Sequence, residues 1–259
     1  MKKAEKIFCV VLIFLLTLYS CSSDKDDSAK LLKKIVATAS DGTEATTLFT
    51  YNGTEIVSID GVQKRTDFTY TNGLISKTVT LDKTNQLSET IEYTYVAGEL
   101  VRIKSTNKYI VNYIHNSDET VSYEKLTINS GNQEVRIYHG ILYFQNENFI
   151  KDERTLDNAG SGELSQYSIS FDYDSKHNPL HNIVGYKKLL DLNEAISSNN
   201  SLISTVIITT TKGDQIASSA KFYKNSFTYD SENYPAEKIS ENAIVGSDNT
   251  GYMKSQFFY

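Results

Sequence analysis

The sequence predicts an all-β domain: an antiparallel meander of repeated hairpins, strongly twisted and either curled or barrel-like, with one short helix near residues 185–196. Two observations lead to this fold class. Apolar and polar residues alternate over many short segments, and a phrase of two aromatics, turn residues and aliphatics recurs along the chain. Tyrosine, threonine and isoleucine are abundant, and only Pro179 and Pro235 interrupt these segments. Such a composition suits pleated sheets with one wet face.

The chain begins with the pattern of an exported protein. Lys2 and Lys3 precede an apolar run over residues 7–18, which is shorter than the roughly 20 residues of a membrane-spanning helix. The sequence Leu18-Tyr19-Ser20-Cys21 resembles a bacterial lipobox, with a larger residue than usual at Tyr19. The resemblance implies cleavage before Cys21 and acylation of its thiol; the alternative is a cysteine that lies there by chance. We expect a lipoprotein signal peptide over residues 1–20.

The following residues predict a flexible acidic tether over residues 21–30. Ser22, Ser23 and several aspartates resemble the acidic export signal of Bacteroidota-type lipoproteins, which implies lipid anchoring at the outer membrane and display at the cell surface. Asp27-Ser28-Ala29 resembles the O-glycosylation acceptor of the same bacteria, which implies Ser28 as a modified residue. A solvated linker of polar residues is the alternative interpretation.

Residues 31–259 contain no linker and predict a single β domain. Cys9 lies within the signal peptide, so the mature domain has no free thiol and no disulfide once Cys21 is acylated. The formal net charge is −6 and the basic residues are scattered singly, which excludes the basic patch of a nucleic-acid-binding protein.

The recurring phrase predicts the hairpins. Its copies are Phe49-Thr50-Tyr51-Asn52-Gly53, Phe68-Thr69-Tyr70-Thr71-Asn72-Gly73, Tyr93-Thr94-Tyr95-Val96-Ala97-Gly98, Phe171-Asp172-Tyr173-Asp174 and Phe227-Thr228-Tyr229-Asp230. Residues two apart in a strand share a face, so the two aromatics of each copy point into one apolar layer. Asn-Gly pairs supply the positive φ angles of tight hairpin turns. Sequential strands should therefore pair antiparallel and merge their aromatic stripes.

The strand pattern is clearest over residues 167–173 and breaks between Asn178 and Leu202. Pro179 should end a strand, and the apolar residues that follow are near helical spacing. We interpret residues 185–196 as one short amphipathic helix that covers an open end or face of the sheet, with Leu189, Leu190 and Ile196 inward. Strands should resume at Leu202 and continue to the C-terminus.

Two copies of the phrase extend to Phe-x-Tyr-Asp-x-x-x-x-Pro, at residues 171–179 and 227–235. Together with the segment between them, they resemble a family of Bacteroidota-type surface lipoproteins with a domain of unknown function, porin-like in fold, and also tyrosine-aspartate-like repeats. This resemblance implies a fold and offers no catalytic residues.

The C-terminal Phe257-Phe258-Tyr259 is similar to the aromatic end of outer-membrane barrels. Many expected strands are shorter than membrane-spanning ones, and charged residues lie within them: Lys77, Arg102, Lys104 and Lys125. We therefore expect a lipid-anchored sheet that does not span the membrane.

Motifs for chemistry are sparse. His177 and His181 have the spacing of metal ligands on a helix, but Pro179 between them favours exposed loop histidines. Asp172 and Asp174 lie two apart and should face solvent and begin a turn, as should Asp230. We predict no catalytic residues, no metal site and no cofactor, and an enzyme is the less favoured class.

The function predicted from these observations is a non-catalytic binding or interaction module. Tyrosine-rich faces bind glycans or peptides by stacking and hydrogen bonding, so a glycan or protein ligand is expected besides the membrane at Cys21. The alternatives are a hydrolase of surface polymers, which requires a pocket with two carboxylates or a nucleophile and base, and a purely structural envelope component that makes contacts through sheet edges or terminal strands.

Overall fold

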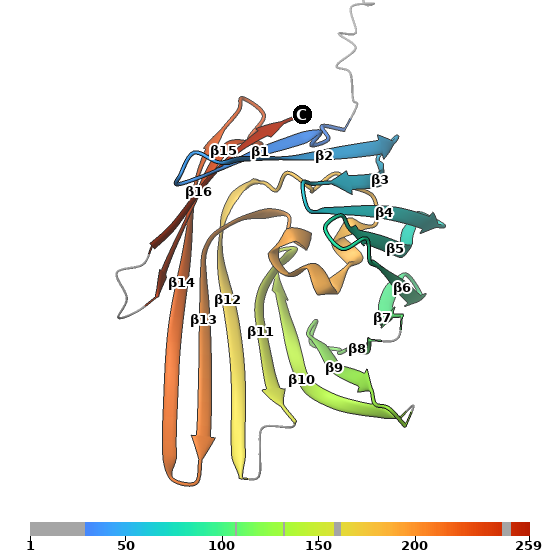
Figure 1. Ribbon diagram of the computed structural model, residues 1–259, viewed down its shortest axis with the longest axis vertical. Coiled ribbons are helices and arrows are strands. Elements are labelled where there is room, and N and C mark those ends of the chain that lie inside the picture. Colours follow the sequence, from blue (N-terminus) through green and yellow to red (C-terminus); the bar gives the residue numbers. More distant parts are fainter. Residues whose placement is uncertain (1–28, 107, 132, 158–161, 245–249) are drawn as a thin grey trace, which may run out of the picture.

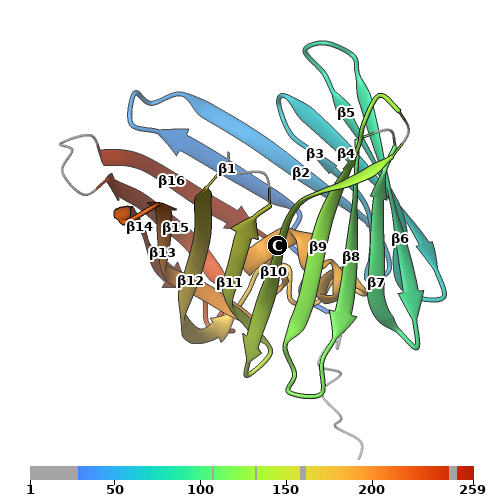
Figure 2. The ribbon, with the colours of Figure 1, turned by 90° about the horizontal axis from the view of Figure 1, so that it is seen from below.

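Sixteen antiparallel strands close into one barrel in the computed structural model, which describes residues 29–106, 108–131, 133–157, 162–244 and 250–259. Each strand pairs with the next in sequence, and β16 pairs with β1 (Figures 1 and 2). The predicted all-β meander of hairpins is confirmed, and of the two forms left open by the sequence it takes the closed barrel.

The strands are β1 (Lys34–Ala39), β2 (Glu44–Asn52), β3 (Glu55–Asp60), β4 (Lys64–Thr71), β5 (Leu74–Asp82), β6 (Ser88–Val96), β7 (Glu99–Ser105), β8 (Tyr109–His115), β9 (Val121–Ile128), β10 (Glu134–Gln145), β11 (Asn148–Leu156), β12 (Glu163–His177), β13 (Asn199–Lys212), β14 (Gln215–Tyr229), β15 (Pro235–Ile244) and β16 (Thr250–Phe258). Two short 3₁₀ helices, η1 (Tyr186–Lys188) and η2 (Leu190–Ile196), lie between β12 and β13.

The aromatics of the recurring phrase face the barrel interior. Phe49, Tyr93 and Phe171 are buried in the core, and their neighbours Thr50, Thr94 and Asp172 are exposed. This two-residue alternation is what a strand with one apolar face requires. Burial of the aromatic stripes supplies the apolar interior that holds the hairpins together.

Each copy of the phrase also contains a β-bulge. The register shifts at Tyr51, Tyr70 and Tyr95, and shifts again at Tyr173 and Tyr229. A bulge bends a strand and increases its twist, so bulges repeated near one end of successive hairpins curl the sheet. Each copy of the repeated phrase therefore adds a bend to the sheet, and the added bends bring β1 and β16 together.

The predicted tight turns are present. Asn72 and Gly73 have φ of 53° and 73°, as a turn with two left-handed residues requires, and Ala97 and Gly98 form the same turn with φ of 52° and 81°. These turns lie at the end of the barrel where the chain also enters and leaves, since Lys34 pairs with Phe258.

The segment between β12 and β13, residues 178–198, folds into the interior and is called the plug (Figure 2). β12 ends just before Asn178 and Pro179, as predicted. Leu189 and Ile196 are buried and Leu190 packs against the core, which confirms their inward orientation. The single amphipathic helix over 185–196 is wrong in form, because Leu189 and Asn193 have non-helical backbone angles that divide it into short 3₁₀ pieces. No helix in the described part of the chain is long and apolar enough to cross a membrane.

Polar contacts fix the plug to the turns at one end of the barrel. The Val184 amide donates to the Thr54 carbonyl at 3.1 Å, and the Tyr70 hydroxyl donates to the Val184 carbonyl at 3.0 Å. Lys187 pairs with Glu147 at 3.1 Å and Lys188 with Glu99 at 2.7 Å. The plug thus closes the end of the barrel at which both described chain ends lie.

The outer wall carries charged side chains in the middle of its strands. Lys77, Glu92 and Lys104 stand opposite one another on β5, β6 and β7, and all three are exposed. The Arg102 guanidinium donates to Asn112 at 3.3 Å, and the Asn112 amide donates to Glu124 at 3.1 Å. Lys125 is different, because it points inward over the Tyr109 ring at 4.0 Å.

Candidate functional site

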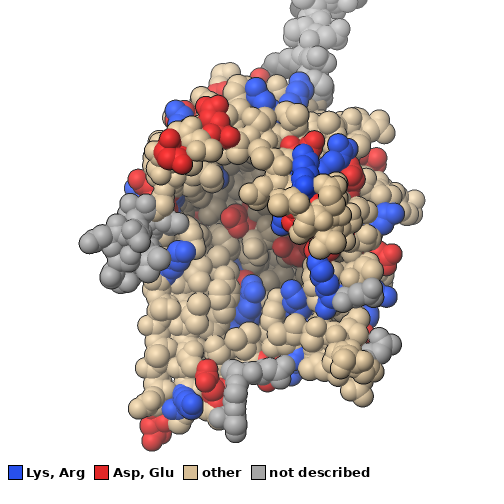
Figure 3. Space-filling model, viewed as in Figure 1, with Lys and Arg blue, Asp and Glu red and all other residues tan. Residues whose placement is uncertain are grey.

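The barrel interior is only partly filled. Three cavities adjoin the plug: a large cavity of about 570 Å³, a charged cavity of about 230 Å³ and a smaller one of about 220 Å³. The large and charged cavities share Asn193, and the large and smaller ones share Glu194, Asn225 and Lys238. They are neighbours around the tip of the plug and are together called the chamber. In the face of the molecule seen in Figures 1 and 3, the space-filling view of Figure 3 shows a hollow with acidic and basic side chains inside it.

The charged cavity is built on β8 to β11, and its residues follow the inward phase of these strands. Its walls are Tyr109, Val111, Tyr113, Tyr123, Lys125, Tyr138, Leu142, Asp152, Arg154, Leu190, Asp191 and Asn193. Gly140 makes room for Tyr123, because a Cβ atom at this glycine would lie 2.7 Å from the Tyr123 ring. A missing side chain on β10 therefore allows one large aromatic to cross the interior.

Arg154 is held in the charged cavity by an acid and two aromatic rings. Its guanidinium pairs with Asp152, and its carbon lies 5.1 Å from the Tyr138 centroid and 4.5 Å from the Tyr167 centroid. The second oxygen of Asp152 accepts a hydrogen bond of 2.6 Å from the Tyr123 hydroxyl. Cation–π contact and charge pairing together keep this buried cation ionised.

Asp191 enters the same cavity from the plug. Burial raises its pKa to about 6, although a hydrogen bond from Tyr93 and the Lys125 charge act in the opposite direction. The Lys125 ammonium has a lowered pKa, because it is buried and lies near Arg154. The cavity thus contains two acids and two bases whose charges are only partly paired.

The large cavity has a different lining, with Tyr167, Phe171 and Tyr223 beside Asn225, Ser204 and Lys238. Burial lowers the pKa of Lys238, and the Glu194 charge opposes this shift. Among the described residues, the Lys238 ammonium has no hydrogen bond or ion pair. Aromatic faces beside free polar groups form a surface to which a polar ring can stack and hydrogen-bond.

Asn193 lies at the junction of the two cavities in a strained backbone conformation. Its φ is 50° and its ψ is −133°, a region that residues with a Cβ seldom occupy. The side chain is exposed and lines both cavities. The plug therefore holds an amide at the centre of the chamber at a cost in backbone energy.

The histidines singled out from the sequence lie outside the chamber. His177 ends β12 and stacks on Tyr234 at 4.9 Å, and the His177 and His181 rings lie 5.5 Å apart. Both are half-buried, so the expectation that they are exposed is wrong; packing against Tyr234 and the plug covers them. No group of three His, Cys, Asp or Glu side chains suited to a metal ion occurs in the described ranges.

The aspartates of the recurring phrase mainly shape turns. Asp230 accepts hydrogen bonds from the amides of Glu232 and Tyr234, at 2.9 and 3.0 Å, as predicted for a turn. Asp174 accepts from the Lys176 amide at 2.8 Å but also from Asn200 and the Tyr229 hydroxyl, so it joins strands and does not face solvent. Asp172 is exposed, as predicted.

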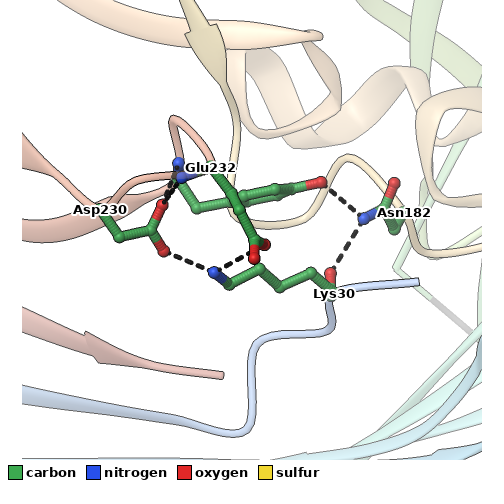
Figure 4. A network of polar contacts seen from close by, with 5 residues as sticks. Lys30, Asn182, Asp230 and Glu232 are labelled. Carbon is green, nitrogen blue, oxygen red and sulfur yellow. Dashed lines mark hydrogen bonds and ion pairs between the residues drawn. The ribbon is translucent and has the colours of Figure 1, made fainter. Parts of the chain in front are cut away.

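Cys21, Ser28 and the signal peptide lie outside the described residues, and only Ala29 and Lys30 of the predicted tether are described. Figure 4 shows that Lys30 is fixed to the barrel. Its ammonium pairs with Asp230 at 2.6 Å and Glu232 at 3.0 Å, and its carbonyl accepts from the Asn182 amide at 2.9 Å. These contacts join the start of the barrel to the β14–β15 turn and to the plug.

Sequence reasoning missed the charged residues of the chamber. Lys125 lies two residues after Tyr123, and Arg154 lies two residues after Asp152, so each shares the inward face of its strand. That phase was a usable signal once β9 and β11 were assigned. Asp191 had no such signal, because the position of the plug depends on contacts distant in sequence. Lys238 lies on β15, where the neighbours on its face are Ala236 and Ser240, so no large apolar residue marks the inward phase.

The chamber meets one condition set for a hydrolase, since Asp152 and Asp191 line a single cavity. Asp152 is already bound by Arg154 and Tyr123, which limits its use as a base. Asp191 has no such partner on its Oδ1 atom.

Fold and site together define a porin-like β-barrel with a plugged end and a polar interior chamber. The chain is similar in fold to the crystal structure of a porin-like protein from Bacteroides uniformis ATCC 8492, with a TM-score of 0.50 over 88% of this chain and 97% of that chain. The sequences are 9% identical, so the likeness concerns the fold alone. No protein-family model matches the chain. No curated protein matches it either.

Proposed function

We propose that this chain is a lipid-anchored outer-membrane lipoprotein, displayed at the cell surface, that captures a small polar ligand in the chamber without chemical conversion. The carrying observation is the chamber, in which tyrosine rings surround polar groups that lack partners of their own. Buried polar groups are normally satisfied, and a cavity that leaves them free is suited to a ligand that satisfies them.

The outer wall supports anchoring by lipid in preference to insertion of the barrel. A membrane-spanning barrel presents an apolar band to lipid and charges there are costly, whereas Lys77, Glu92 and Lys104 lie in the middle of the wall. The interior is correspondingly apolar and aromatic outside the chamber. These outer-wall charges favour a barrel held at the membrane by a lipid, for which the lipobox-like Cys21 would be the attachment point.

The chain ends give the proposed orientation. The tether leads into Lys30 at the plugged end, whereas the large cavity is walled by Gly251 to Met253, where β16 begins at the opposite end. With a lipid attached at Cys21, the plugged end would be nearer the membrane and the large cavity would be directed away from it.

Anchoring is tested with full-length protein and a Cys21→Ser variant in a bacterium that processes lipoproteins. We expect the wild type in the membrane fraction, accessible to protease on intact cells, and the variant released in soluble form. Mass spectrometry of the released N-terminal peptide would report a glycan at Ser28. A Cys21→Ser protein that stays in the membrane after a high-pH wash would instead support an inserted barrel.

Ligand capture is tested by filling the chamber. Ser204 lines the large cavity, and the adjacent Thr205 on the same strand points to the outer wall. Ser204→Trp should abolish binding of members of a glycan and peptide panel that the full-length protein retains, and Thr205→Trp should leave binding unchanged. Equal binding by both variants would place the ligand outside the large cavity.

The two alternatives are less well supported. A hydrolase would require turnover that Asp152→Asn and Asp191→Asn abolish, and a panel that is bound but returned unchanged would exclude it for those compounds. A structural component that makes contacts through sheet edges would need an unpaired edge strand. β1 and β16 pair with each other, which leaves no free edge among the described strands.

A further inference from the structure

Three polar groups in the charged cavity lack partners, and they define what a ligand there must offer. The Nε atom of Arg154 and the Oδ1 atom of Asp191 are buried without a hydrogen-bond partner among the described residues. The Lys125 ammonium has no hydrogen bond or ion pair within the same ranges and lies over the Tyr109 ring at 4.0 Å. Lys125, Arg154 and Asp191 all line this cavity, so a ligand that enters it meets two cations and a carboxylate with unused hydrogen-bonding capacity.

The two cations approach the same ring. The Lys125 nitrogen lies 5.8 Å and the Arg154 carbon 5.1 Å from the Tyr138 centroid. Their mutual repulsion contributes to the lowered pKa of Lys125, after the larger effect of burial. An acceptor with two oxygens and a negative charge, placed between them, would relieve the repulsion and satisfy both donors.

Neither acid of the cavity bridges the two cations, and Asp191 makes no hydrogen bond or ion pair with Lys125 or Arg154 among the described residues. Asp152 has one oxygen on the Tyr123 hydroxyl, at 2.6 Å, and the other on the Arg154 guanidinium. Asp191 accepts from Tyr93 and keeps Oδ1 free. The free Oδ1 atom requires a donor from the ligand, which a hydroxyl group supplies.

We propose that the charged cavity binds a small hydroxycarboxylate, with its carboxylate between Lys125 and Arg154 and a hydroxyl donating to Asp191. The cavity volume of about 230 Å³ is below the range of drug-sized sites, so it accommodates a single ring or a short chain. One acidic sugar has this size and chemistry, and Tyr109 and Tyr138 supply flat faces for its ring. This inference rests on the proposed function and names the ligand class of its chamber.

The test is calorimetric titration of the full-length protein in detergent with glucuronate and with glucose. The two sugars differ only at C6, where glucuronate has a carboxylate and glucose a hydroxymethyl group. We expect glucuronate to bind at least about tenfold more tightly than glucose, as loss of a charge-assisted hydrogen bond implies. Lys125→Met should weaken glucuronate binding by about ten- to a hundredfold and leave glucose unchanged. Asp191→Asn should weaken both sugars, because each offers a hydroxyl.

Lys77→Met is the matched control, since Lys77 is an exposed lysine on the outer wall. Its glucuronate affinity should equal that of the wild type. Lys125→Met removes a buried charge without a partner, so it should fold, as a thermal melt would verify. Equal affinity for the two sugars, an unchanged Lys125→Met variant, or no binding of glucuronate would each overturn the hydroxycarboxylate assignment. Capture in the chamber would then be decided separately by the Ser204→Trp and Thr205→Trp pair.

Discussion

At the scale of single residues, the second aromatic of each recurring phrase acts through its hydroxyl. Tyr51 donates to the Leu32 carbonyl at 2.7 Å, and Tyr95 donates to the Ile75 carbonyl at 2.8 Å. Each of these acceptors belongs to a neighbouring hairpin or to the segment before it. A phenylalanine would preserve the apolar stripe but not these bonds, which explains why tyrosine fits this position.

Tyr95→Phe should lower the free energy of unfolding by about 1 kcal/mol, because the hydroxyl is lost and the Ile75 carbonyl loses the donor of its hydrogen bond. Tyr252→Phe is the control, since Tyr252 is exposed on β16 and should change stability by less than about 0.5 kcal/mol. Urea unfolding of both variants makes the measurement. Equal stability of the two would show that the repeat tyrosines act only as apolar rings.

At the scale of elements, the strands could be predicted and the plug only in part. Alternation over residues 167–173 and the turn at Asn72-Gly73 are local signals, and the structure confirms both. The helical spacing of Leu189, Leu190 and Ile196 indicated correctly which side chains are inward. It could not indicate the backbone form, because the plug follows the shape of the barrel interior. The local backbone hydrogen bonds within the plug join residues three apart, as in 3₁₀ turns. Tertiary packing decided the conformation.

Asn193→Gly tests whether the kink in the plug is strained. Glycine tolerates a φ of 50° with a ψ of −133°, so relief of strain should exceed the entropy cost of glycine and raise stability by about 1 kcal/mol. Asn193→Ala retains a Cβ atom and should give no such gain. Both variants lose the amide that lines the two cavities, so both should weaken the ligand affinity. Thermal unfolding and titration separate the two effects, and a stabilised alanine variant would contradict the strain argument.

At the scale of the whole molecule, closure and the chamber depend on contacts that no local pattern reveals. β1 and β16 are at opposite ends of the described barrel sequence, and Lys34 meets Phe258 only because the curvature of fifteen pairings between consecutive strands adds up. The bulges that produce this curvature occur at the repeated tyrosine of the phrase. The sequence shows the repeat, but only the strand register shows that each tyrosine marks a bulge. The inward charges of Lys125 and Arg154 follow the strand phase, but their convergence on Tyr138 follows from closure.

The stability of the closed barrel should depend on pH through Asp191, which lies in the plug. The titratable groups that face its carboxyl are Tyr93 and Tyr95 of β6, Tyr109 and Tyr113 of β8, Lys125 of β9 and Tyr186 of η1. Its pKa is raised from 3.8 in the unfolded chain to about 6 in the barrel. The ionised carboxylate therefore destabilises the folded state above pH 6. This cost decreases as the pH falls from about 6 to 3.8, because the folded state takes up the proton first.

Asp191→Asn removes the titration and nearly preserves the shape. The variant should exceed the wild type in free energy of unfolding by up to about 3 kcal/mol at pH 8, and the difference should shrink toward zero at pH 4. Comparing the two proteins at each pH cancels the remaining carboxylates, many of which have lowered pKa values and lose their stabilising effect in acid. A difference that stays constant from pH 8 to pH 4 would show that Asp191 does not titrate in this range, and that the asparagine acts by packing alone.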